Sequence, residues 1–187
     1  MSVRAIRASL KEAEVSAKPA LEVLLLYENL GTALRAKQSL DLLPGQLGIA
    51  TPLGTRLWRL DLLGEPLLAE QAAIEAAAAD VIVLSLHGRT TLRAEVCHWL
   101  SRWLDHKEDR AYALAALLDP EPARPVSDNP VVAYLKRIAE AANADLVCGF
   151  CDAPVATPGS SACQIMERAL DSAAVFEGTP NRSQRRP

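Results

Sequence analysis

The chain has 187 residues, half of them hydrophobic, and a formal net charge of −3 at pH 7. This length suits one domain with a substantial core, and the charge excludes an overall basic field of the kind that holds nucleic acid. The first apolar run, over 21–27, follows a mixed polar segment and is too short to span a membrane. We therefore expect a cytoplasmic protein with reduced cysteines that binds neither nucleic acid nor a membrane.

The two ends of the chain differ from its middle. Residues 1–19 are charged and small with little periodicity, which predicts a loose N-terminal arm. Residues 177–187 carry glycine and prolines among polar and basic residues, which predicts a disordered tail. A single α/β domain is expected over 20–176.

Short apolar runs alternate with longer helical patterns across this domain. Strands are predicted over 21–27, 55–63, 80–86, 110–118 and 144–150. Helices are predicted over 29–43, 64–80, 89–105, 129–144 and 161–175. In the first helix the expected buried positions are Leu30, Ala33, Leu34, Leu40 and Leu43.

Two strands have patterns that suggest their place in a sheet. Alternating polar and apolar residues over 55–63 indicate an edge strand, whereas Val81, Ile82 and Val83 in succession indicate a central one. Helix starts are also marked: Asp128 or Asn129 before Pro130, and Ser161 with Gln164 in capping-box spacing.

Five βα units imply a parallel sheet, because each crossover between parallel strands is right-handed. The prediction is a doubly wound five-stranded sheet of order 2-1-3-4-5 with helices on both faces, which is a flavodoxin-like arrangement. Ligands of such sheets bind at the carboxyl ends of the strands, where the first and third strands part. The candidate ligand-binding residues at this edge are Glu28, Asn29, Ser85, His87, Gly88, Arg89 and Asp119.

Two other pairs of residues carry weaker signals. Ser85 and His87 could form a nucleophile and base, but two residues along one strand separate them too far for a direct hydrogen bond. Cys148 and Cys151 have C-x-x-C spacing, which suits a redox pair or, with further ligands, zinc. We favour structural roles for all four residues, and predict no catalytic residue, metal or cofactor.

The five βα units over about residues 20–175 resemble receiver domains of response regulators. Receivers carry two acids after the first strand, an acceptor aspartate after the third, a hydroxyl residue after the fourth and a lysine after the fifth. This chain has Glu28-Asn29 for the acids, Ser85-Leu86-His87 for the acceptor and Leu118-Asp119 for the hydroxyl residue, and no lysine follows its fifth strand. The resemblance therefore implies a receiver-like domain that forms no acyl phosphate.

A second resemblance rests on the order of "YEN…G…RA", "LWRLDLL", "ADVIVLSLHG" and "HWLSRWL". It is to an uncharacterised family of small bacterial proteins and implies no activity.

Two functional hypotheses follow. The first is a non-catalytic regulatory or protein-interaction domain with an unidentified protein partner. This hypothesis is compatible with a homodimer. The alternative is a small-molecule or anion-binding protein, with or without enzymatic activity, that uses the carboxyl-edge crevice. A crevice plugged by leucines favours the first hypothesis, and an open pocket lined by polar side chains favours the second.

Overall fold

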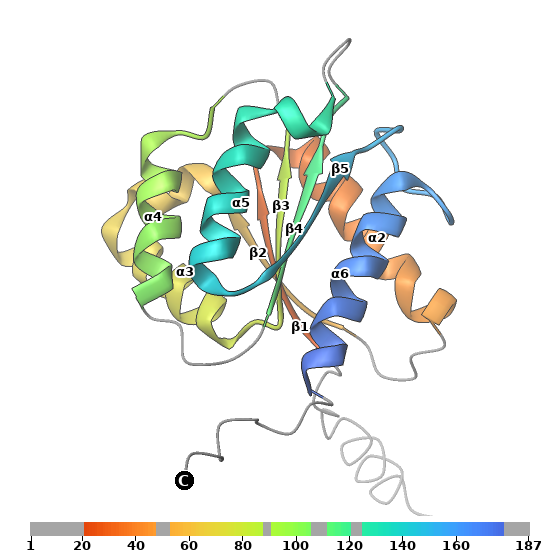
Figure 1. Ribbon diagram of the computed structural model, residues 1–187, viewed down its shortest axis with the longest axis horizontal. Coiled ribbons are helices and arrows are strands. Elements are labelled where there is room, and N and C mark those ends of the chain that lie inside the picture. The colour runs from red at the N-terminus through yellow and green to blue at the C-terminus, as the bar shows by residue number, and fades with distance from the viewer. Residues whose placement is uncertain (1–20, 48–52, 88–90, 106–111, 121–124, 178–187) are drawn as a thin grey trace, which may run out of the picture.

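The computed structural model describes residues 21–47, 53–87, 91–105, 112–120 and 125–177 (Figure 1). The strands are β1 (Glu22–Tyr27), β2 (Gly54–Arg59), β3 (Val81–Leu86), β4 (Ala113–Leu118) and β5 (Asp145–Phe150). The helices are α2 (Leu30–Leu47), α3 (Pro66–Ala78), α4 (Ala94–Asp105), α5 (Pro130–Ala142) and α6 (Ser161–Glu177), with short 3-10 turns η1 (Leu60–Gly64) and η2 (Val126–Asp128). The arm and most of the tail expected from the sequence lie outside these residues.

All strand pairs are parallel, and the order is β2-β1-β3-β4-β5, which confirms the predicted topology. Helices α3, α4 and α5 cover one face of the sheet, and α2 and α6 cover the other (Figure 1). Every residue of β3 and of β4 is buried, as expected for central strands that helices cover on both sides. No helix within the described part of the chain has the length and apolarity needed to cross a membrane.

Strand β2 lies at the edge of the sheet, as its alternating pattern predicted, but it is shorter than predicted. It ends at Arg59, and the chain then turns through η1. Leu60 and Leu63 are buried in the core under α3 and α4. Their spacing of three matches the period of a 3-10 helix, so the apolar residues that suggested a longer strand belong to this turn.

The face that helix α2 presents to the sheet was predicted in part. Ala33, Leu40 and Leu43 are buried as expected, but Leu30 is 71% exposed and Leu34 is 51% exposed. Thr32, Arg35 and Ser39 are buried in addition, and the Ser39 hydroxyl donates to the Arg35 carbonyl oxygen. Hydrophobic periodicity misplaced part of the buried face because polar residues with hydrogen-bond partners occupy it.

Helix α6 packs very close to the sheet. A Cβ atom added at Gly149 would lie 2.8 Å from Cδ1 of Ile165 on α6. Ala113 and Ala115 of β4 face the same helix, which presents Ala169 among its own buried residues. Small side chains on both surfaces therefore allow the close approach.

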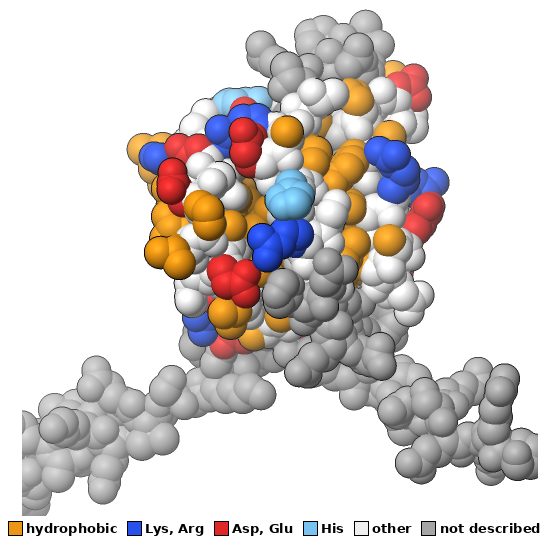
Figure 2. Space-filling model, turned by 90° about the vertical axis from the view of Figure 1, so that its left-hand side faces the viewer, with side chains coloured by type: hydrophobic (Ala, Val, Ile, Leu, Met, Phe, Trp, Pro, Cys, Tyr) orange, Lys and Arg blue, Asp and Glu red, His pale blue; other side chains and the backbone are white. Residues whose placement is uncertain are grey.

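On the opposite side of the molecule, hydrophobic side chains lie among acidic and basic ones where α3 and α4 form the surface (Figure 2). Leu67 of α3 is 87% exposed. It therefore offers a matched control for the fully buried leucines of the core.

We predict that Leu84→Ala lowers the free energy of unfolding by about 2–5 kcal/mol, because it leaves a cavity in a fully buried strand. Leu67→Ala should leave stability nearly unchanged. Urea denaturation of both variants measures the difference, and equal stabilities would contradict the placement of β3 at the centre of the core.

Candidate functional site

The period of two along each strand decides which residues meet at the carboxyl edge. Val81 and Val83 of β3 face α2 and α6, and so do Ala115 and Leu117 of β4. Continued past the strand ends, this alternation places Ser85, His87 and Asp119 on the same side. Cys151, which follows β5, belongs to the same buried cluster. The site therefore forms on the face that α2 and α6 cover.

Direct contacts bridge the gap between the ends of β1 and β3. The His87 backbone N–H donates to Oε2 of Glu28 over 2.8 Å. The side-chain amide nitrogen of Asn29 lies 2.5 Å from Nε2 of His87. The structure thus brings these three predicted residues together, but their mutual contacts fill the crevice between the first and third strands.

The start of α2 is held by side chains of the chain itself. The Thr32 backbone N–H donates to Oδ1 of Asn29 over 3.1 Å, so Asn29 caps the helix. The Thr32 hydroxyl oxygen accepts from the N–H groups of Glu28 and Asn29 and donates to the Asn29 carbonyl oxygen. The Thr32 hydroxyl and backbone N–H are therefore already engaged.

Ser85 does not line an open site. It is completely buried, and its hydroxyl donates to the Thr32 carbonyl oxygen over 2.8 Å. Nη2 of Arg35 lies 3.4 Å from the same hydroxyl and 3.4 Å from the Leu86 carbonyl oxygen. These contacts favour the structural role for Ser85 over a nucleophilic one.

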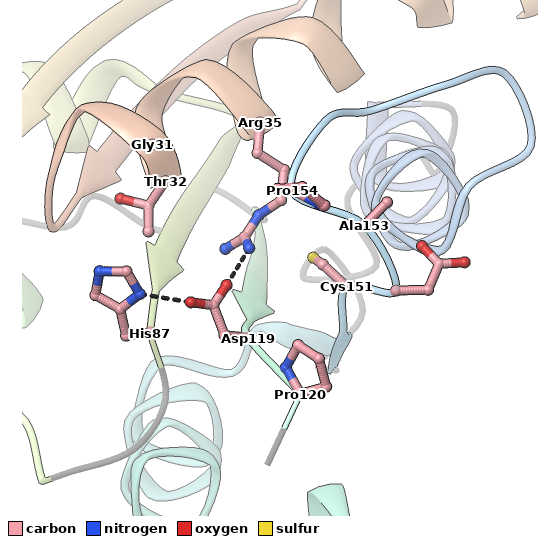
Figure 3. Close-up of a pocket in the computed structure, with 10 residues that line it drawn as sticks. Gly31, Thr32, Arg35, His87, Asp119, Pro120, Cys151, Ala153 and Pro154 are labelled. Atoms are coloured by element: carbon pink, nitrogen blue, oxygen red, sulfur yellow. Dashed lines mark hydrogen bonds and ion pairs between the residues drawn. The ribbon is translucent and has the colours of Figure 1, made fainter. Parts of the chain in front are cut away.

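The central electrostatic feature is a chain of three side chains, Arg35, Asp119 and His87 (Figure 3). Nη1 of Arg35 forms an ion pair with Oδ1 of Asp119. Nδ1 of His87 lies 2.5 Å from the other carboxylate oxygen, Oδ2. Arg35 is only 3% exposed, so its charge depends on this carboxylate for compensation.

The ionised form of Asp119 is favoured in this arrangement. Burial by itself raises the pKa of the carboxyl group, but hydrogen bonds from Arg35 and His87 and the arginine charge outweigh burial. The pKa of Asp119 consequently lies below its ordinary value of 3.8. The group is a carboxylate throughout the physiological pH range.

A pocket of about 310 Å³ opens beside this chain of side chains, displaced from the predicted crevice toward β4 and β5. Its walls come from the start of α2, the ends of β3 and β4, and the loop that follows β5 (Figure 3). The lining residues are Gly31, Thr32, Arg35, His87, Asp119, Pro120, Cys151, Asp152, Ala153 and Pro154. A smaller cavity, of about 70 Å³ and lined in part by Leu60, Leu86 and Leu92, lies on the other side of Glu28.

The loop between β5 and α6 forms the outer wall of the pocket. The Ser161 hydroxyl donates to Oδ1 of Asp152 over 2.7 Å and accepts from the Asp152 N–H over 2.9 Å. The predicted capping box of Ser161 and Gln164 is therefore wrong: Ser161 fastens the loop, and the Gln164 side chain donates to the Gly159 carbonyl oxygen. Gly159 has a φ of +79°, a left-handed conformation that favours glycine.

The two C-x-x-C thiols lie on opposite faces of the sheet. Cys148 packs against the core under α3, α4 and α5, whereas Cys151 belongs to the core under α2 and α6. Burial raises the pKa of both thiols, that of Cys151 to about 11. Within the described residues no group of three or more histidine, cysteine or acidic side chains is arranged to hold a metal ion. The geometry therefore favours the structural role over redox pairing.

Part of the site was predictable from the sequence. Of the predicted residues, His87 and Asp119 line the pocket, while Glu28, Asn29 and Ser85 do not. Gly88 and Arg89 lie outside the described residues. Arg35 was missed because its partner is 84 residues away and the helical face was misassigned. Its position three residues after the buried Thr32 is the one local signal that could have found it.

No protein-family model and no curated protein matches this sequence. An oxidoreductase from Corynebacterium diphtheriae has a similar fold, with 11% identity, a TM-score of 0.52, and coverage of 86% of this chain and 98% of that one. A short-chain flavodoxin associated with a bacterial microcompartment gives 13% identity, a TM-score of 0.48 and coverage of 84% and 97%. General stress protein 14 from Treponema denticola, in complex with FMN, gives 16% identity, a TM-score of 0.43, and coverage of 84% of this chain and 98% of that one.

The flavodoxin-like fold is thus confirmed, and the receiver resemblance holds only at this level. The expectation of a non-catalytic, receiver-like interaction domain is wrong. The similar structure with the TM-score of 0.52 is an oxidoreductase and not a signalling domain. The open pocket, which includes His87, Asp119 and Asp152 in its lining, also matches the alternative hypothesis, that of a small-molecule-binding protein.

We predict that Asp119→Asn lowers the free energy of unfolding by about 1–3 kcal/mol at pH 7, because Arg35 loses its counter-charge. Since the folded state depresses the Asp119 pKa, this carboxylate stabilises the fold above its unfolded pKa and ceases to do so as the pH falls through the folded pKa. The difference between wild type and variant should therefore vanish in acid. Denaturation at pH 7 and near pH 3 measures it.

The control for this experiment is Asp41→Asn, which breaks an exposed ion pair with Lys37 within α2. It should have little effect at either pH, since exposed pairs contribute little. Equal losses in the two variants would show that Arg35 does not depend on Asp119.

We also predict that Cys148 and Cys151 do not form a disulfide with each other under mild oxidation, because the sheet separates them. In the folded protein, Cys151 should react much more slowly with Ellman's reagent than in the unfolded chain, since its thiol is almost completely buried and protonated. Peptide mapping after oxidation would contradict this prediction if it recovered a Cys148–Cys151 linkage from folded protein.

Proposed function

We propose that this protein binds a small polar organic molecule that donates hydrogen bonds, and that Asp119 is the anchor for it in the carboxyl-edge pocket. The observation that carries the proposal is the state of Asp119: an ionised carboxylate, held from two sides, at an open pocket. The position agrees with the rule that open α/β sheets bind ligands beyond the carboxyl ends of their strands.

The carboxylate has acceptor capacity left for a ligand. Two carboxylate oxygens offer about four lone-pair sites, and Arg35 and His87 use one on each oxygen. The Asp119 side chain is 23% exposed, so part of it faces the pocket. Hydroxyl or amino groups of a ligand are the natural partners for this remaining capacity.

The pocket volume of about 310 Å³ lies at the lower end of the range for small-molecule sites. Apolar surface from Pro120, Ala153 and Pro154 adjoins the polar group. A compact ligand with an apolar body and one donor-bearing edge fits this combination.

Charge argues against a ligand whose phosphate sits at the start of α2. Glu28 stands there, and the Thr32 hydroxyl and N–H are already engaged. Among the described residues that line the pocket, the only arginine or lysine is Arg35, which Asp119 neutralises, and Asp152 adds a further negative charge. The described residues therefore do not fit the phosphate of FMN at this helix, although FMN is the ligand in the Treponema denticola complex. A flavin without phosphate remains within the proposed class.

The proposal predicts which compounds stabilise the protein. In thermal-shift and calorimetric titrations we expect neutral or cationic donors, with riboflavin and adenosine as the first probes, to bind more tightly than FMN and AMP. Asp119→Asn should weaken binding by about tenfold or more, since a hydrogen bond to a charged group contributes about 1.5–3 kcal/mol. Asp61→Asn, at an exposed ion pair beyond β2, is the matched control and should bind like wild type.

Because Asp119→Asn also changes stability, a second variant tests the pocket itself. Ala153→Leu adds bulk to the wall without touching the ion pair, and it should reduce affinity while the fold stays stable. The proposal is overturned if no donor compound binds the wild type, if the phosphorylated compounds bind more tightly, or if either variant binds as well as wild type.

A further inference from the structure

The contact between Asn29 and His87 has a fixed direction. Oδ1 of Asn29 accepts from the Thr32 N–H, so the amide NH₂ group is the part that faces His87. An amide NH₂ group only donates, and Nε2 of His87 must therefore be an unprotonated acceptor. Nδ1 carries the proton and donates it to Asp119. The imidazole is thus neutral, with both ring nitrogens satisfied.

Protonation of Nε2 would place two donors against each other at a separation of 2.5 Å. Asn29 cannot resolve this conflict by turning its amide over, because the NH₂ group would then face the Thr32 N–H. Either Asn29 leaves its capping position on α2 or the imidazolium moves away. A proton on Nε2 of His87 and the present contact between Asn29 and His87 therefore exclude each other.

Charged groups surround the imidazole from several elements. Glu28 at the end of β1 accepts from the His87 backbone N–H, and Asp119 at the end of β4 holds the ring. Arg35 of α2 and Asp152 after β5 line the same pocket. The three carboxylates favour a proton on the ring, while Arg35 and the Asn29 donor oppose it. The two sets of groups therefore act in opposite directions on one ring nitrogen.

We infer that His87 is a proton-operated specificity residue: its neutral form keeps Asn29 on the α2 cap, and its protonated form releases that cap and adds a positive charge to the pocket. On the proposed function, on which this ligand consequence rests, a cationic donor binds better to the neutral form. Binding of such a ligand then displaces one proton from His87.

The switch can be tested without any ligand. In the wild-type chain we expect the Thr32 backbone amide, the Asn29 side-chain amide and the His87 ring to shift with one common midpoint during an NMR pH titration. The hydrogen-exchange protection factor of the Thr32 amide should fall by about tenfold on acidification through that midpoint, which is the size of an N-cap contribution. A Thr32 amide that ignores the His87 titration would overturn the inference.

Two substitutions of Asn29 should change the pH dependence of Thr32 amide protection in different ways, which a purely structural role would not produce. Asn29→Ser retains a capping side chain but is too short to reach His87, so Thr32 protection should become independent of the His87 proton. Asn29→Asp caps the helix and accepts from an imidazolium, so protection should now rise on acidification. Loss of protection on acidification in all three proteins would contradict the proposed coupling.

Failure of the ligand proposal would look different. If riboflavin and adenosine do not bind while the Thr32 amide still follows His87, the switch stands and the proposed function falls. If a cationic donor binds but calorimetry in buffers of different ionisation enthalpy detects no proton release near the midpoint, the pocket stands and the link to His87 falls.

Discussion

The buried ion pair between Arg35 and Asp119 is the constraint on which the carboxyl edge depends. It joins a helix that leaves β1 to a carboxylate at the end of β4, and it passes over the end of β3 on the way. A guanidinium that is 3% exposed would be very costly without its partner, so the position of α2 relative to the sheet is coupled to one carboxylate. The same carboxylate orients His87. Removing a charge here would therefore change helix position, imidazole orientation and pocket shape together.

This arrangement shows how a common fold accommodates a different charge distribution. The chain shares its strand order and overall shape with flavodoxin-like proteins. Helix α2, however, begins with an engaged threonine beside an acidic residue, and Arg35, the one arginine among the described residues of the pocket lining, is already neutralised. Fold and ligand chemistry are separable, because the sheet fixes where side chains converge whereas the side chains decide what they attract.

The fold could be predicted from the sequence because the central strands are continuous apolar runs with few alternatives. The errors occurred where hydrophobicity alone was ambiguous. The leucines of η1 were predicted to belong to a strand, and Leu30 and Leu34 were predicted to be buried although they face solvent. Topology also predicted that Asn29, His87 and Asp119 would converge. Topology could not predict that side-chain contacts would bridge the ends of β1 and β3 while a pocket stays open toward β4 and β5. That outcome depends on side-chain geometry between distant segments.

The close seating of α6 has a bearing on how such a pocket changes size. Gly149, Ala113 and Ala115 lack the bulk that would hold this helix away from the sheet, and the loop that precedes the helix forms a wall of the pocket. A larger side chain at any of these positions would lift the helix and the loop before it. Small side chains between α6 and the sheet thus help to set the dimensions of the cavity. Residues that do not touch a bound molecule can therefore limit the size of that molecule.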